Sequence, residues 1–182
     1  MHGDADVGAM ALHLTVRIDE RRTEPEVWRA VIRSGEESGA GARVLTAATL
    51  HRVHYADPSW AEQLREAVPD LSSIGSAFAD RELISMIDES SLFTDSLCVI
   101  SSVDIDAAAV GSLVSHALVR GVARVFDGDT IAILLTGAFP AAMGGPVVDP
   151  AEVAARRAHW ASIGFVDIPG TAAMLLPVGS RP

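Results

Sequence analysis

The sequence predicts a single α/β domain in which a central mixed β-sheet is flanked by helices. Three observations predict this class: apolar segments that suit strands, intervening segments with helical spacing and capping residues, and a strand–helix–strand order in the second half of the chain. The chain has 182 residues, 49% of them hydrophobic, which suffices for one core without cross-links. We expect the domain to span residues 11–178, between flexible ends at residues 1–10 and 179–182.

The first part of the chain predicts a helix between two strand segments. Residues 11–18 alternate between apolar and polar side chains, as in a half-buried strand. A helix from Thr23 through Ile32 is expected next, because Thr23 and Glu26 have the spacing of a capping box. Residues 42–55 are rich in Val, Leu and Thr and predict a strand or a pair of strands.

Two helical segments are expected after these strands. Ser59 and Glu62 repeat the capping-box spacing, which predicts a short helix that ends near Ala67. Residues 71–89 carry apolar side chains at helical spacing, which predicts a helix that is bent at residues 79–81.

The second half of the chain predicts a parallel pair of strands joined by a helix. Residues 97–105 are mostly apolar and predict a central strand. Asp106 is the expected N-cap of a helix whose apolar stripe runs to Phe126. Residues 130–136 are too few for a helix and rich in branched side chains, so they predict a buried strand parallel to residues 97–105.

The chain closes with one more helix and one more strand. Asp149 as N-cap and Pro150 at the first helical position predict a helix that ends at Gly164. Residues 171–176 then predict the last strand of the sheet.

Composition argues against several classes of partner. The formal net charge of −10, with 14 Lys and Arg residues, disfavours nucleic acid and anionic membranes, because each phosphate contact needs a basic side chain. Cys98 is the single cysteine and lies in an apolar run, so neither a disulfide nor a cysteine metal site is expected. With no long apolar segment and no basic leader, we expect a cytoplasmic protein without a metal, a membrane contact or a nucleic-acid partner.

The last helix and strand carry a family-like pattern. Trp160 precedes the pair Gly164 and Phe165 by four residues at a helix end, and a strand follows. With residues 100–105, the next helix and residues 131–135, this pattern resembles the acyl-CoA-binding core of the GNAT superfamily of N-acetyltransferases. Residues 57–78, in turn, resemble a branch of that superfamily with a helical insertion before the central strand.

The resemblance implies an N-acyltransferase that moves an acyl group from a phosphopantetheine thioester to a small-molecule amine. The donor is acyl-CoA or an acyl group on an acyl-carrier protein. In this superfamily the pantetheine arm hydrogen-bonds to the backbone of the central strand and enters the loop after it. The donor-binding residues that this implies here are Val103, Ile105, Ala109, Val110, Gly111 and Ser112.

The loop after the central strand departs from the superfamily pattern. Its basic residue is replaced by Asp106, the loop is shorter, and alanines stand at residues 107–109 where close backbone approach needs glycine. Backbone amides at a helix N-terminus attract a pyrophosphate, and a carboxylate there competes with it and repels it. This departure favours a carrier-borne donor over CoA. The alternatives are a non-catalytic binding module and another reaction on a tethered thioester.

Three residues are candidates for catalysis. Asp104 and Ser102 share one face of the predicted strand, because side chains alternate, and either could meet the acceptor amine or position a water. The alternative for both is a hydrogen-bonded polar residue at a strand edge. His54 is a candidate base, with an ordinary surface histidine as the alternative. His51, three residues earlier, lies on the opposite face of that strand, which argues against a shared metal site.

Other residues have simpler interpretations. Trp160 stands where the superfamily often has a tyrosine that protonates the leaving thiolate, and an indole cannot supply that proton. Trp28 and Trp60 are expected to pack in the core. His159 lies near a helix end, where the dipole favours a cation, and His116 lies off the apolar stripe, where we expect it to be solvated.

Overall fold

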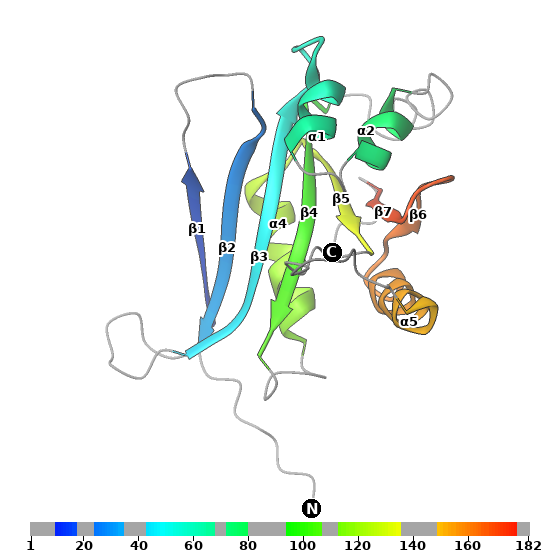
Figure 1. The fold of residues 1–182 in the computed structure, drawn as a ribbon. Helices are drawn as coiled ribbons and strands as arrows, with labels where there is room; N and C mark the ends of the chain where they lie inside the picture. The colour runs from blue at the N-terminus through cyan, green and yellow to red at the C-terminus, as the bar shows by residue number, and fades with distance from the viewer. Residues whose placement is uncertain are drawn as a thin grey trace, which may run out of the picture.

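One seven-stranded sheet with helices on both faces makes up the described part of the protein (Figure 1). The computed structural model describes residues 10–17, 24–34, 43–67, 72–79, 94–106, 113–135 and 149–177. Its elements are β1 (Met10–Arg17), β2 (Glu26–Ser34), β3 (Arg43–His54), α1 (Trp60–Ala67), α2 (Ser72–Phe78), β4 (Ser96–Ile105), α4 (Val114–Val125), β5 (Thr130–Leu134), α5 (Pro150–Ala161), β6 (Val166–Asp167) and β7 (Ala173–Leu176).

The sheet is mixed, as the sequence predicts. Its order is β1-β2-β3-β4-β5-β7-β6. Strands β1 to β4 form an antiparallel meander, β4 and β5 are parallel, and β5, β7 and β6 are antiparallel again. The parallel pair requires a crossover connection, and α4 is the helix of that crossover.

Helices cover the two faces of the sheet with separate apolar clusters. On one face, α4 buries Leu118 and Val122 against Leu50 of β3 and Ile100 of β4, and Trp160 of α5 joins this cluster. On the other face, the buried residues of α1 and α2 pack against the sheet; they are Leu64 and Ile74, beside Val53, Leu97 and Val99. Cys98 is buried in the α4-side cluster, as expected for a core residue.

The expected helix from Thr23 through Ile32 is wrong, because Glu26–Ser34 form strand β2. This strand pairs with β1 on one side and β3 on the other, and it buries Ala30 and Ile32, alternate residues, in the core. A cap contributes about 1 kcal/mol. Pairing on both edges satisfies the backbone of a whole strand and packs its branched side chains, which outweighs a local capping signal.

The expected role of Asp106 as the N-cap of α4 is also wrong. Helix α4 begins at Val114, with Leu113 at its N-cap position. The amide of Asp106 donates instead to the carbonyl of Leu45 on β3, at 2.9 Å, and its carboxylate forms an ion pair with Arg43. Asp106 therefore continues the pairing of β4 with β3.

Most of the other predicted elements agree with the structure. Within the expected segment of residues 42–55, Arg43–His54 form one strand, β3, and the parallel pair and the short helix α1 lie where they were expected. Asp149 caps α5 by accepting from the amide of Ala151 at 2.9 Å, and Gly164 follows that helix with a φ of 109°. The two-residue strand β6 was not predicted. The expected flexible ends lie outside the described residues except for Met10, which begins β1. The second part of the expected helix over residues 71–89 also lies outside them. None of the helices in the described segments is long and apolar enough to span a membrane.

Candidate functional site

Strands β4 and β5 separate part-way along their length, and a cavity lies where they part. Residues 97–100 of β4 pair with residues 130–133 of β5, after which β4 continues to Ile105 and β5 ends at Leu134. Figure 1 shows the two strands diverging towards their arrowheads, with α5 beside the gap. The cavity has a volume of about 290 Å³ and is lined by Ile100, Ser102, Val103, Asp104, Ile105, Ile133, Leu134, Ala155, Arg156, His159 and Trp160.

A β-bulge in β4 coincides with the point where the strands part. Leu50 of β3 lies opposite Ile100, and its neighbour Thr49 lies opposite Ser102, so Ser101 is an extra residue. The hydroxyl of Ser101 donates to the carbonyl of Thr49 at 3.2 Å. A bulge bends its strand and increases the local twist. It therefore accounts for the divergence of β4 from β5 after Ile100.

The backbone of β4 presents hydrogen-bonding groups to the cavity that no described strand pairs with. The carbonyl of Asp104 accepts from Thr46 Oγ1 of β3 at 2.8 Å, and the amide of Asp106 also bonds to β3. Backbone groups of successive residues in a strand point to opposite edges. Those of Val103 and Ile105 therefore point away from β3, and no described strand pairs with them there. The carbonyls of this edge can accept hydrogen bonds from a bound extended chain, and its amides can donate hydrogen bonds to that chain.

The side chains of Ser102 and Asp104 lie on the face of the sheet opposite α4. In the ladder with β3, Ser102 lies opposite Thr49 and Asp104 opposite Ala47, whereas Val103 between them packs against the α4-side cluster. The prediction that the two polar residues share a face is confirmed. Ser102 is half-buried and Asp104 is exposed at the cavity wall, so both can be reached from outside.

His54 lies at the far end of β3 and is not brought together with these residues. It pairs with Ser96 at the start of β4, eight residues before Asp104, which is roughly 26 Å at about 3.3 Å per residue. Its Nδ1 lies 2.7 Å from Ser96 Oγ, and its Nε2 lies 3.5 Å from Glu26 Oε1. His51 pairs with Val99 and faces the opposite side, as predicted. No group of metal-ligating residues occurs in the described segments.

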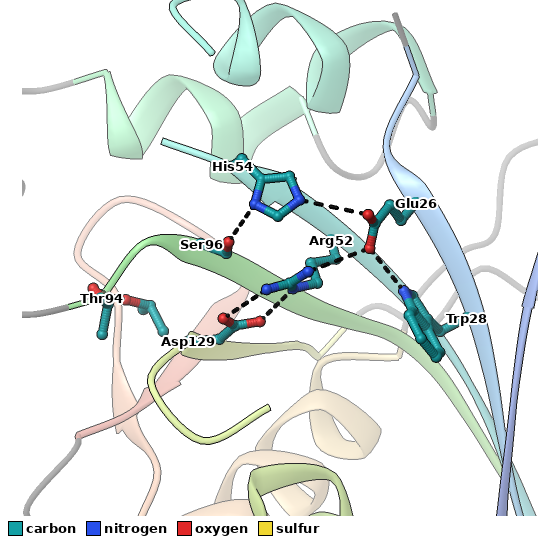
Figure 2. Close-up of polar contacts among 8 residues, drawn as sticks. Glu26, Trp28, Arg52, His54, Thr94, Ser96 and Asp129 are labelled. Atoms are coloured by element: carbon teal, nitrogen blue, oxygen red, sulfur yellow. Dashed lines mark hydrogen bonds and ion pairs between the residues drawn. The ribbon is translucent and has the colours of Figure 1, made fainter. Parts of the chain in front are cut away.

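A second, larger cavity of about 1180 Å³ surrounds this end of the sheet. Glu26, Trp28 and Arg52 line it and belong to a polar network. Figure 2 shows this network, in which the Arg52 guanidinium contacts both oxygens of Asp129, at 2.6 and 3.1 Å, and Glu26 at 3.4 Å. Glu26 also accepts from the indole of Trp28 at 3.1 Å. The network connects β2 and β3 with the turn before β5, and its groups are engaged with one another. We interpret it as a structural clamp.

The pKa values in this network follow from its contacts. The hydrogen bonds that Arg52 donates to Asp129 raise the pKa of Arg52 above its ordinary value. Burial alone would raise the pKa of Glu26, but hydrogen bonds from Trp28 and His54 and the charge of Arg52 outweigh burial and lower it. Burial raises the pKa of Cys98, which makes this thiol a poor nucleophile.

Two polar residues of α5 line the first cavity, Arg156 and His159. Sequence reasoning missed Arg156 and related His159 only to the helix dipole. Arg156 donates to the carbonyl of Leu135 at 3.0 Å and forms an ion pair with Glu152. His159 Nε2 lies 2.9 Å from the hydroxyl of Ser115 on α4. The spacing of three residues places Arg156 and His159 on one helix face, which was the available signal in the sequence.

The six donor-binding residues expected from the sequence fall into two groups, two that are described and four that are not. Val103 and Ile105 line the cavity. Ala109, Val110, Gly111 and Ser112 lie outside the described residues.

Comparison with known proteins adds solved structures of low similarity. No protein-family model and no curated protein matches the chain. A mutant of KacT is 14% identical, with 85% of this chain and 73% of that chain covered. The KacTA–DNA complex and AtaTR bound with AcCoA are both 12% identical and cover 94% and 93% of this chain, and 96% and 95% of those chains. All three have a TM-score of 0.47, and a likeness of this size carries no argument about chemistry.

Proposed function

We propose that the protein is an acyltransferase that takes an acyl group from a thioester on a phosphopantetheine arm and transfers it to an amine. The observation that carries this proposal is the free backbone edge at Val103 and Ile105, which faces the cavity between β4 and β5. The proposal also agrees with the GNAT-like pattern of the sequence, in which the arm binds along this strand.

The chemistry of the arm suits this edge. A pantetheine arm is an extended chain with two amide groups and little branching. An extended chain can bind to an unpaired strand edge as an additional strand does, through amide hydrogen bonds. The side chains of Val103, Ile133 and Leu134 give the cavity apolar walls for the methylene groups of the arm.

The source of the arm is the finer part of the proposal. A carrier protein presents the arm on one phosphate that is held largely by the carrier, whereas CoA adds a pyrophosphate and a nucleotide. The acidic start of the loop after β4 favours the carrier, although Arg43 balances part of the charge of Asp106. We therefore propose a carrier-borne donor, with acyl-CoA as the alternative.

The acceptor is proposed to bind beside Asp104 and Ser102. The exposed carboxylate of Asp104 attracts a protonated amine, and the hydroxyl of Ser102 can orient it. The ammonium first releases one proton to solvent. The neutral amine nitrogen then attacks the thioester carbonyl, the carbon–sulfur bond breaks, and the nitrogen loses a second proton while the sulfur gains one. His54 lies too far along the sheet to share this step. We also propose that the acceptor is small and neutral or cationic, and that nucleic acid is not a partner, because the net charge is −10. The proposed location is the cytoplasm.

Binding and product analysis together test the proposal. Calorimetry would compare an acetylated carrier protein, S-acetyl-pantetheine and acetyl-CoA under identical conditions. Each bound donor would then be mixed with ethanolamine, glycinamide and a lysine-containing peptide, with thiol release and amide mass as readouts. Donor binding followed by amide formation supports the transferase. Binding with thiol release but no amide would indicate hydrolysis of the thioester. If none of the three donors binds, the result would support the alternative of a non-catalytic binding module.

A further inference from the structure

The cavity between β4 and β5 has one ionisable wall residue that can both accept and donate a proton near neutral pH. Its ionisable side chains are Asp104, Arg156 and His159. A guanidinium keeps its proton in proteins, and carboxylates as a class are poor proton donors at neutral pH. Imidazole is the side chain whose two forms are both accessible there. His159 is therefore the residue of this wall that suits proton transfer.

The ring of His159 is held in place by two helices. Its Nε2 lies 2.9 Å from the hydroxyl of Ser115, a residue of α4 with 2% exposure. The ring packs edge to face on Trp160, with centroids 4.7 Å apart, and on His116, with centroids 5.8 Å apart. In the described part of the chain, Nδ1 has no hydrogen-bond partner. A fixed imidazole with one nitrogen engaged and the other available is a common arrangement for proton transfer.

The proposed reaction needs such a group. When an amine displaces a thiolate, the nitrogen must lose one proton and the sulfur must gain one. A neutral imidazole can take the proton from the nitrogen as the carbon–nitrogen bond forms. The resulting imidazolium can give the same proton to the sulfur as the carbon–sulfur bond breaks, so that the residue ends unchanged.

We infer that His159 is a catalytic residue that carries the proton from the attacking amine to the leaving sulfur, and that Ser115 is its positioning residue. This inference rests on the proposed acyltransferase function. It assigns the proton transfer to α5 and leaves Asp104 and Ser102 on β4 to hold the acceptor.

The surroundings of His159 agree with this role. Burial against the helices, and then the charge of His116, lower the pKa of His159 below its ordinary value of 6.5. The ring is therefore neutral at pH 7 and ready to accept a proton. Three ionisable groups face it: His116 from α4, Arg156 from its own helix and Asp104 across the cavity on β4.

The first test separates binding from proton transfer without requiring a known acceptor. An acetyl-pantetheine analogue in which a methylene group replaces the sulfur is added to the full chain. Calorimetry reports its binding, and the imidazole NMR signals report its neighbours, with His159→Gln used for assignment. We expect the signals of His159 to shift on binding and those of the distant His54 to stay unchanged. Binding that leaves the His159 signals unmoved overturns the inference while the proposed function stands. The absence of binding overturns both.

The second test is kinetic. It uses S-acetyl-pantetheine as donor and, as acceptor, whichever of ethanolamine, glycinamide and the lysine-containing peptide reacts fastest. His159→Gln should lower kcat by about 100-fold or more, with the KM for the donor changed by less than about threefold. His13→Gln, at an exposed position of β1 that is not part of the cavity wall, is the matched control and should keep kcat within about threefold. Ser115→Ala should shift the acidic limb of the pH–rate profile, a readout that loss of packing alone would not move. A kcat for His159→Gln within threefold of wild type contradicts the inference.

Discussion

Arg52 of β3 holds Asp129, in the turn before β5, through two hydrogen bonds of 2.6 and 3.1 Å (Figure 2). The carboxylate of Asp129 is almost fully buried and the guanidinium is about three-quarters buried, with side-chain exposures of 6% and 22%. The contact joins segments 77 residues apart and lies across β4 from one neighbouring strand to the other. It thus stabilises the start of the parallel pair.

Removing the buried carboxylate should be costly. Asp129→Asn leaves Glu26 as the acidic neighbour of Arg52 in the described part of the chain, and we expect a loss of about 3 kcal/mol in the free energy of unfolding, as for other broken buried pairs. Urea unfolding at pH 7 measures this loss. Asp167→Asn breaks the exposed pair with Arg157 and is the control, with an expected loss below about 1 kcal/mol. If both variants lose the same free energy of unfolding, the contact between Arg52 and Asp129 does not stabilise the fold more than an exposed ion pair does.

Filling the cavity between β4 and β5 should block the donor. Both Ala154 and Ala155 of α5 are exposed, but only Ala155 lines the cavity. We expect Ala155→Phe to weaken binding of S-acetyl-pantetheine at least tenfold, about 1.4 kcal/mol, and Ala154→Phe to leave the affinity within about twofold. Calorimetry measures the affinity of both variants for S-acetyl-pantetheine, and circular dichroism verifies that both are folded. If the two variants bind alike, the donor does not occupy this cavity.

Two glycines of helices α2 and α4 should respond differently to alanine. A β-carbon on Gly75 would lie 2.8 Å from the backbone carbonyl oxygen of Ala61 on α1, whereas one on Gly121 would meet the end of the Leu12 side chain, which can rotate away. Alanine favours a helix by about 1 kcal/mol over glycine. We therefore expect Gly121→Ala to change stability by less than about 1 kcal/mol, and Gly75→Ala to cost about 1–2 kcal/mol.

Thermal and urea unfolding of both glycine variants measure the difference. A Gly75→Ala protein that is as stable as Gly121→Ala would contradict the close packing of α1 on α2.

The buried histidine of β3 should make stability depend on pH. His51 is buried, its Nδ1 has no hydrogen-bond partner among the described residues, and burial lowers its pKa below 6.5. The unfolded chain then binds a proton more readily than the folded one as the pH falls below 6.5. The contribution of His51 to stability is present above that pH and is lost as the pH falls through the lowered pKa of the folded state.

Replacing this histidine with leucine should remove that dependence. We expect His51→Leu to stabilise the protein by about 1 kcal/mol at pH 7, because it removes an unsatisfied polar group, and by more at pH 5.5. Urea unfolding at both pH values is the measurement. His13→Leu, at an exposed position of β1, is the control and should change stability by less than about 0.5 kcal/mol at either pH. A gain for His51→Leu that is the same at pH 7 and pH 5.5 would contradict the pKa direction.

The sequence by itself determined the elements whose signals are local and strong. The Asp149 and Pro150 start of α5, the short helix α1 and the apolar strand β4 each follow from residues close together in the chain. The same holds for the order strand, helix, strand that makes β4 and β5 parallel. Alternation along β4 was enough to place Ser102 and Asp104 on one face, because side-chain direction in a strand has a period of two.

Tertiary structure alone decided the features that depend on neighbours distant in the sequence. Glu26–Ser34 carry a capping signal at their start but form a strand, because β1 and β3 offer backbone partners on both edges. The edge at Val103 and Ile105, which no described strand pairs with, arises from a bulge that only the register with β3 reveals. The contact between Ser115 and His159 joins residues 44 positions apart. Local propensity does not encode the pairing of distant segments, and in this protein that pairing builds the candidate site.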